Sequence, residues 1–150
     1  AITVGWMLLA WAAMRCASDW LARWLWTLGF AALLVHLAFA FGLAHGWSHA
    51  AAVEHVREVG GYGEGIVVNY LFAAVWLADV LWWWANPSSR ASRPRWVAVA
   101  VHGLLLFVVV NATVIFGPAE RRFAYGVAFL LLATRFGKMG KIGSLVKNAP

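Results

Sequence analysis

Cysteine and charged residues are scarce in this chain. The single cysteine, Cys16, excludes an internal disulfide and a Cys-x-x-Cys metal clip. Charged residues make up only 12% of the 150 residues, against about 25% in soluble domains. Walker, dinucleotide-binding and Ser/His/Asp motifs are all missing. No motif therefore identifies a reaction or a catalytic residue, and we expect that the chain is not an enzyme by itself.

Long apolar runs take the place of charge, and 63% of the residues are hydrophobic. Residues 27–44 and 97–117 each contain one ionisable side chain, a histidine, and residues 65–85 contain one charged side chain, an aspartate. About 20 such residues, at 1.5 Å rise per residue, cross a hydrocarbon layer about 30 Å thick. These runs predict membrane-spanning helices.

The complete pattern predicts an all-α, polytopic membrane helical bundle over residues 1–136, followed by a basic tail at 137–150. The first and last spans are short, and the last crosses only if its flanking arginines reach the interfaces. A helix-compatible stretch at about 45–59 is expected to continue the second helix outside the membrane or to lie along the membrane surface. The five expected spans cover, approximately, residues 1–17, 22–44, 65–86, 96–117 and 119–136.

Lysine and arginine residues alternate between the two sides of this bundle. Nine belong to the connections after the first and third spans and to the end of the last span, and three lie on the opposite side. Cytoplasmic loops carry the excess of positive charge, so we expect the N-terminus outside and the C-terminus in the cytoplasm of a multi-pass protein of a bacterial inner membrane. The net charge of +6 is then a feature of topology, and nucleic acid is not an expected partner.

Tryptophan marks the same boundary. Seven of the eleven tryptophans fall at the expected cytoplasmic side, where indole rings favour the headgroup layer. These seven are Trp20, Trp24, Trp26, Trp82, Trp83, Trp84 and Trp96. Trp6, Trp11 and Trp76 are expected to pack between helices.

Polar groups at membrane depth require partners, because their desolvation is otherwise uncompensated. Asp79 and His102 both lie about 10 Å from the cytoplasmic boundary, on consecutive spans. Neither has another ionisable partner at that depth, so we expect the two side chains within hydrogen-bond reach. The pair is consistent with an ion pair, a proton relay or a quinone site, but we favour a hydrogen bond that fixes the register of the two helices.

The histidines of the outer stretch are candidate metal ligands. On a helix continuing to about Val59, His45 and His49 share one face about 6 Å apart. Neutral imidazole suits zinc, copper or iron, and His55 and Glu64 are available to complete the metal site. The alternative is a solvated polar helix face without a metal.

His36 and His102 are candidate cofactor-binding residues for a haem iron or a chlorin magnesium. The Ala32–His36 and Ala98–His102 spacings resemble the Ala-xxx-His pattern of bacterial light-harvesting helices, where the alanine leaves space for the macrocycle. The match covers five residues at a time, and we base no family assignment on it. A depth difference of about 11 Å argues against one haem held by both histidines. A hydrogen-bonded core histidine is the alternative at each position.

Two functions follow from these features. The first is a small integral membrane subunit or accessory protein of a larger membrane complex, with the bilayer and other membrane subunits as partners and a transition metal, haem or chlorin as candidate cofactor. The alternative is an autonomous haem- or metal-dependent membrane protein with a histidine site on its outer face.

Overall fold

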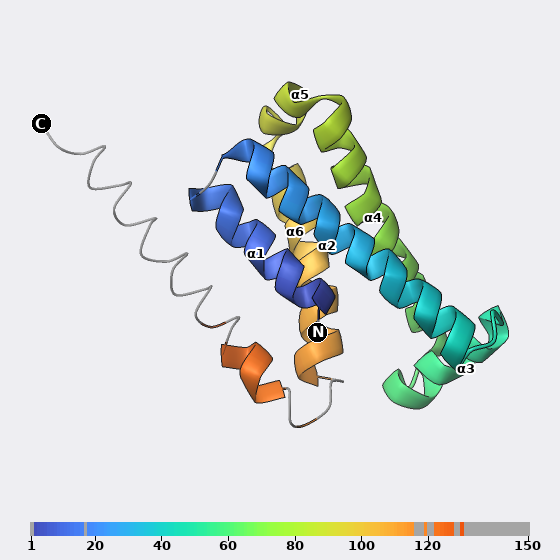
Figure 1. The fold of residues 1–150 in the computed structure, drawn as a ribbon. Coiled ribbons are helices and arrows are strands. Elements are labelled where there is room, and N and C mark those ends of the chain that lie inside the picture. Colours follow the sequence, from blue (N-terminus) through green and yellow to red (C-terminus); the bar gives the residue numbers. More distant parts are fainter. Residues whose placement is uncertain (1, 17, 116–118, 120–121, 128–129, 131–150) are drawn as a thin grey trace, which may run out of the picture. The chain divides into compact units, whose positions relative to one another are not determined.

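The computed structural model describes residues 2–16, 18–115, 119, 122–127 and 130 (Figure 1). Every regular element in these ranges is helical, which confirms the predicted all-α class for them. The chain divides into two compact units, residues 1–109 and 110–150. The elements are α1 (Ile2–Cys16), α2 (Asp19–Phe39), a π-helical turn η1 (Ala40–Ala44), α3 (His49–Gly60), a 3-10 turn η2 (Gly63–Gly65), α4 (Ile66–Ala85), α5 (Pro87–Ala91), α6 (Arg95–Val110) and a π-helical turn η3 (Asn111–Ile115).

Three helical stretches are long and apolar enough to cross a membrane, judged by length and composition: Asp19–Ala44, Gly63–Ala85 and Arg95–Ile115. They correspond to the second, third and fourth predicted spans. The helix α1 has 15 residues and is about 22 Å long, so it falls short of a hydrocarbon layer of about 30 Å. The fifth predicted span lies mostly outside the described residues, and the basic tail at 137–150 lies wholly outside them.

Short polar side chains begin the helices. The hydroxyl of Ser18 accepts a hydrogen bond from the backbone of Leu21 at the start of α2, and Ser48 accepts one from Ala51 at the start of α3. Such N-caps satisfy amide groups that a helix leaves unpaired. The expected turn after α4 is itself a helix of five residues, α5, which Asn86 caps and Pro87 begins.

The helix α2 does not continue to residue 59. It ends in η1, and the chain reverses between His45 and Ser48 before α3 starts as a separate helix. Gly46 and Trp47 both have positive φ angles, 53° and 61°. The reversal brings the Trp47 ring against Gly42, where an added Cβ would lie 3.2 Å from the ring. Glycine at 42 and 46 therefore permits a turn that hydrophobicity alone does not reveal.

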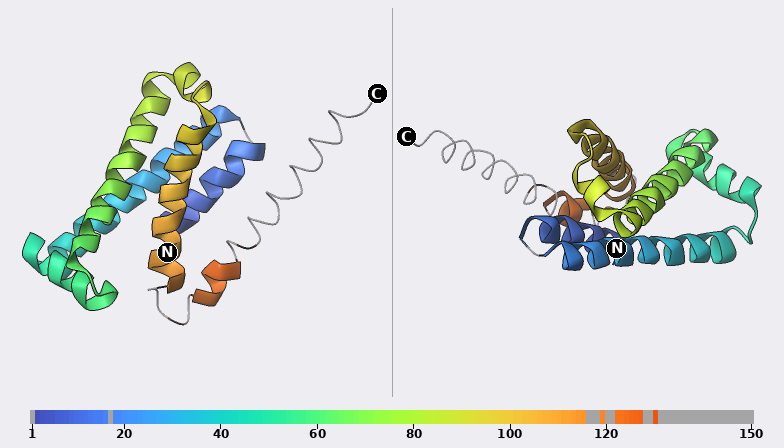
Figure 2. Two further views of the ribbon diagram at one scale, coloured as in Figure 1. Left: turned by 180° about the vertical axis from the view of Figure 1, so that it is seen from behind. Right: turned by 90° about the horizontal axis from the view of Figure 1, so that it is seen from above.

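The core of the first unit lies where α1 and α2 meet α4 and α6. The helices α1 and α2 run side by side, and α4 and α6 lie on the same face of that pair (Figure 2). Small buried residues, including Ala10 and Ala22, allow α1 and α2 to approach closely. Trp26, Trp76 and Leu105 are completely buried between the helices. This arrangement brings one end of α2, α4 and α6 together with α5.

Candidate functional site

Asp79 of α4 lies at the centre of a buried group of charged and aromatic side chains. It is only 2% exposed. The indole Nε1 of Trp26 on α2 donates to Oδ2 of Asp79 at 3.0 Å. Arg90 of α5 donates from Nη2 to Oδ2 at 2.9 Å and from Nε to Oδ1 at 3.3 Å. Arg93, in the turn before α6, donates from Nη1 to Oδ1. The carboxylate thus accepts four N–H groups.

His102 of α6 extends the group toward α1. The indole Nε1 of Trp11 donates to Nδ1 of His102 at 3.2 Å, and Nη2 of Arg93 lies 3.2 Å from Nε2. Both neighbours carry only donors, whereas a neutral imidazole offers one acceptor. Each tautomer of His102 therefore accepts from one of these two N–H groups and leaves the other without an acceptor on the ring. We call Trp11, Trp26, Asp79, Arg90, Arg93 and His102 the Asp79 cluster.

Aromatic rings enclose the cluster. Trp26 lies 5.0 Å from Trp76 and 5.4 Å from His102, measured between ring centroids. The guanidinium of Arg90 lies 3.6 Å from the centroid of Trp83, a close cation–π contact. These rings exclude water from the ion pairs, which strengthens the electrostatic interactions inside the cluster.

The charges of the cluster do not balance. Two guanidinium groups face one carboxylate, which leaves a net charge of +1 when His102 is neutral. Burial lowers the pKa of Arg90 from its ordinary value, and the hydrogen bonds and charge of Asp79 oppose that shift. An arginine side chain nevertheless stays protonated in proteins. The cluster therefore retains its positive charge.

The local sequence explains how the arginines reach Asp79. The side chain of Asn86 accepts from the backbone of Ser89 at 2.8 Å and starts α5. The hydroxyl of Ser89 in turn accepts from Nε1 of Trp82 at 3.1 Å, which ties α5 to the end of α4. This short helix folds back, and the long stems of Arg90 and Arg93 carry their guanidinium groups into the bundle.

The predicted pairing of Asp79 with His102 needs a correction. The two residues belong to one cluster, as their shared depth suggested, but Arg93 bridges them and replaces the expected direct contact. Arg90 and Arg93 were not predicted to reach Asp79, because both lie in the turn expected on the cytoplasmic side. Trp26 was expected in the headgroup layer, whereas this ring is buried against Asp79. The sequence does contain one signal for this contact: Asp79 lacks a charged partner within its own span, and Arg90 follows it by 11 residues.

The two candidate cofactor ligands are not brought together. His102 lies in the Asp79 cluster with both ring nitrogens next to donors. His36 lies on the exposed surface of α2, and within the described residues no hydrogen bond or ring contact engages its side chain. The two histidines thus occupy different environments.

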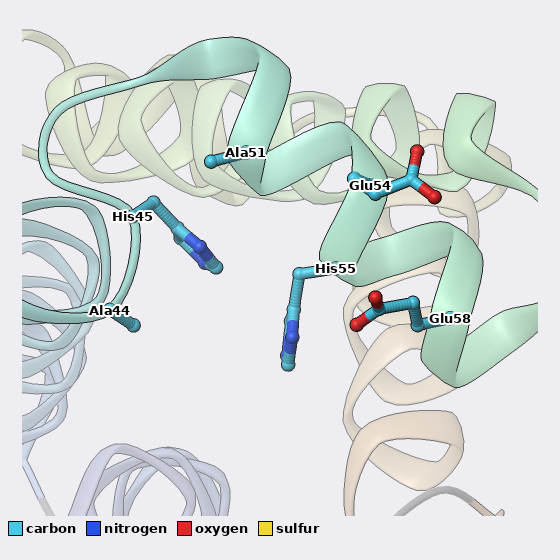
Figure 3. A pocket seen from close by; sticks show the side chains of 6 residues that line it. All are labelled: Ala44, His45, Ala51, Glu54, His55 and Glu58. Carbon is cyan, nitrogen blue, oxygen red and sulfur yellow. The ribbon is translucent and has the colours of Figure 1, made fainter.

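The chain reversal rearranges the histidines that were predicted to bind a metal. The rings of His45 and His55 lie 5.2 Å apart between centroids. They border an open pocket of about 340 Å³ (Figure 3). His49 turns to Tyr70 of α4 instead, with 2.8 Å between Nδ1 and the phenolic oxygen. The expected His45–His49 face depended on a continuous helix, which the reversal at residues 45–48 interrupts. The pocket is lined by Ala44, His45, Ala51, Glu54, His55 and Glu58.

The predicted set of four metal ligands does not converge. Glu64 is exposed in η2, and Glu54 of the pocket pairs with Arg57. In the part of the chain that the structure describes, no three side chains of His, Cys, Asp or Glu are grouped in a way that could hold a metal ion. His45 and His55 remain as a pair of neighbouring imidazoles.

Comparisons with protein-family models, with curated proteins and with solved structures found no match.

The chemistry of the site therefore has to be inferred from its own contacts. A carboxylate whose oxygens accept from two guanidinium groups and an indole is a poor general base, because every one of these bonds favours the ionised form. The contacts of Asp79 instead join α2, α4, α5 and the turn before α6. The geometry indicates that the Asp79 cluster holds these elements in place.

Proposed function

We propose that this protein is a small integral membrane subunit or accessory protein of a larger membrane complex, not an enzyme by itself. In this proposal it lies in a bacterial inner membrane with five spans, its N-terminus outside and its C-terminus in the cytoplasm. The three long apolar helices support membrane residence. The hydrogen bonds of Asp79 to Trp26, Arg90 and Arg93 support a structural role, in which the cluster holds the helices together.

The observation that carries the proposal is a pair of exposed polar side chains on the spans. His36 on α2 and Asn69 on α4 are both exposed, and neither has a partner among the described residues. His36 lies about 7 Å from the middle of Asp19–Ala44, and Asn69 lies about 7 Å from the middle of Gly63–Ala85. Both are displaced toward the end of the bundle where Phe41 contacts Tyr70. Both groups then lie within a hydrocarbon layer about 30 Å thick.

Lipid tails offer these groups no hydrogen bond. Unsatisfied polar groups in hydrocarbon are unfavourable, and interhelical hydrogen bonds are a common way to satisfy them. The contact between Phe41 and Tyr70 shows that the two helices face each other at this end. We infer that helices of another subunit supply polar side chains to His36 and Asn69 at matching depth.

The test compares complexes isolated in mild detergent from native membranes. His36→Leu and Asn69→Leu should each weaken association about fivefold, since one interhelical hydrogen bond is worth about 1 kcal/mol. The control variants Val35→Leu and Val68→Leu change exposed apolar neighbours and should leave association unchanged. Equal yields of complex from all four variants would contradict the proposal.

A second candidate, an autonomous metal- or haem-dependent protein, draws support from the proximity of His45 and His55. Two imidazoles at this distance are compatible with one transition-metal ion whose other positions are filled by water. Elemental analysis of protein purified without chelator should then show metal that a His45→Ala, His55→Ala double variant lacks. His49→Ala is the control, because His49 bonds to Tyr70. A metal-free wild type would remove this candidate.

A further inference from the structure

Three arginines lie over three consecutive tryptophans at one end of the first unit. The guanidinium carbons of Arg90 and Arg93 lie 3.6 and 5.9 Å from the ring centroids of Trp83 and Trp82, and that of Arg23 lies 4.8 Å from the ring of Trp84. The first two arginines share the carboxylate of Asp79. Arg23 is not part of the Asp79 cluster, and unlike Arg90 and Arg93 it forms no ion pair with Asp79.

Arg23 of α2 has no acceptor for its N–H groups within the described residues. Its Nε is covered by protein and makes no hydrogen bond. Asp19, one turn earlier on α2, forms no ion pair with it among the described side chains. The residue as a whole is half-buried, so part of its side chain reaches the surface. Arginine carries five N–H donors, so the Arg23 guanidinium can bind an acceptor that is not among the described residues.

The Trp84 ring beneath the Arg23 guanidinium is held in a defined position. Nε1 of Trp84 donates to the hydroxyl of Thr27 at 2.9 Å, and that hydroxyl donates to the backbone oxygen of Arg23 at 2.8 Å. Trp24 packs edge-on against Trp84 with 5.0 Å between centroids. The indole that carries the guanidinium is therefore fixed by two further contacts, so less side-chain entropy remains to be lost when a ligand binds.

The surroundings of Arg23 are those of a membrane interface. Trp20 is 62% exposed, and Trp24 and Trp84 are each 40% exposed. Exposed indoles at the end of an apolar helix favour the headgroup layer of a bilayer. Three guanidinium groups, those of Arg23, Arg90 and Arg93, outnumber the carboxylates of Asp19 and Asp79 here, so the local field favours an anion.

We propose that Arg23, with its guanidinium over the ring of Trp84, binds the phosphate of an anionic phospholipid from the adjacent leaflet. The planar guanidinium presents paired N–H donors that match two phosphate oxygens, and such charge-assisted bonds are short and strong. The exposed faces of Trp24 and Trp84 provide apolar contact for the glycerol and upper acyl chain. This inference rests on the proposed membrane location but is independent of any partner subunit.

The test measures lipid retention by native mass spectrometry of the purified chain. The wild type, mixed with equal amounts of phosphatidylglycerol and phosphatidylcholine, should retain phosphatidylglycerol preferentially. Arg23→Gln should weaken this retention at least about tenfold, because it removes a bidentate charge-assisted contact. Arg95→Gln is the control, since Arg95 lies exposed at the start of α6, and it should bind like the wild type.

Two further arms make the outcome decisive. Trp84→Leu keeps the charge but removes the indole platform, so it should weaken retention as well, and it serves as the test if Arg23→Gln does not fold. A titration with inorganic phosphate should leave the bound lipid in place. Retention of phosphatidylglycerol that is unchanged in Arg23→Gln or in Trp84→Leu, or that is lost equally in Arg95→Gln, would overturn the proposal. Displacement of the lipid by millimolar phosphate would overturn it too, because the site would then select a free anion. The mass of the complex from native membranes tests the subunit proposal separately.

Discussion

Replacement of Asp79 by leucine should destabilise the protein more than any other single change in the cluster. The carboxylate is 2% exposed, and the side chains of Arg90 and Arg93 are 9% and 6% exposed. Asp79→Leu leaves two buried guanidinium groups without their carboxylate and removes the acceptor of the Trp26 indole. Removing one partner of a buried ion pair costs about 3–5 kcal/mol. Asp79→Asn keeps one oxygen acceptor, so its cost should be smaller, about 2 kcal/mol.

The assay is reversible unfolding in mixed micelles, followed by circular dichroism, with the free energy of unfolding compared between variants. Glu64→Gln is the control, because Glu64 is exposed in η2, just before α4 begins, and makes no ion pair within the described residues. Its loss should cost less than about 1 kcal/mol, the usual range for a charge at a helix terminus. The reasoning is refuted if Asp79→Leu stays within about 1 kcal/mol of the wild type, since breaking a buried pair is expected to cost several times more. It is also refuted if Asn and Leu at this position are equally destabilising.

Other predictions concern the indole donor, the end of α3 and the orientation. Trp26→Phe should cost about 2 kcal/mol of unfolding free energy, because it removes a hydrogen bond to a buried carboxylate, whereas Trp24→Phe should cost less in the same unfolding assay. Gly61→Ala should lower the free energy of unfolding by about 1–2 kcal/mol, because φ at residue 61 is +83° and L-residues are strained in that region. Gly60→Ala is the control, because Gly60 has neither a positive φ nor close neighbours. Equal losses in the two variants would contradict the expected backbone strain. A cysteine at exposed Ser88, in a background lacking the native cysteine, should react with an impermeant maleimide in inverted membrane vesicles but not in intact cells; labelling of intact cells would reverse the proposed orientation.

The long helices were predictable because their signal is local. An apolar run as long as 97–117 satisfies its backbone within one segment of a hydrocarbon layer by forming a helix, because a transmembrane strand needs only about 10 residues. Length and hydropathy therefore identified the helices that contain His36, Asp79 and His102. The short first helix was harder to interpret, because its 15 residues fall below the length that distinguishes a span from other apolar helices.

The details of the cluster were not predictable for a different reason. Positive residues near a span were interpreted as topology markers, and that rule does not describe where a long side chain points. Arg90 and Arg93 follow Asp79 by 11 and 14 residues, and a five-residue helix is needed to return them to it. The equal depths of Asp79 and His102 predict that they share a layer but do not reveal that Arg93 lies between them.

The outer segment shows the limit of helix periodicity. Residues 45–59 are compatible with a helix almost throughout, so His45 and His49 seemed to share a face. The Trp47 ring lies against Gly42, a contact that forms only when the chain has reversed, and helix periodicity does not reveal it. That reversal separates His49 from His45 and brings His55 into its place.

The measurement that tests the central claim most directly is the mass of the particle that contains this chain, extracted from native membranes into lipid nanodiscs without detergent exchange. The subunit proposal predicts a particle in which the 16.5 kDa chain is accompanied by at least one other polypeptide in fixed stoichiometry. It also predicts that this accompaniment is reduced when His36 and Asn69 are both replaced by leucine. Particles that contain only this chain and lipid would contradict the account.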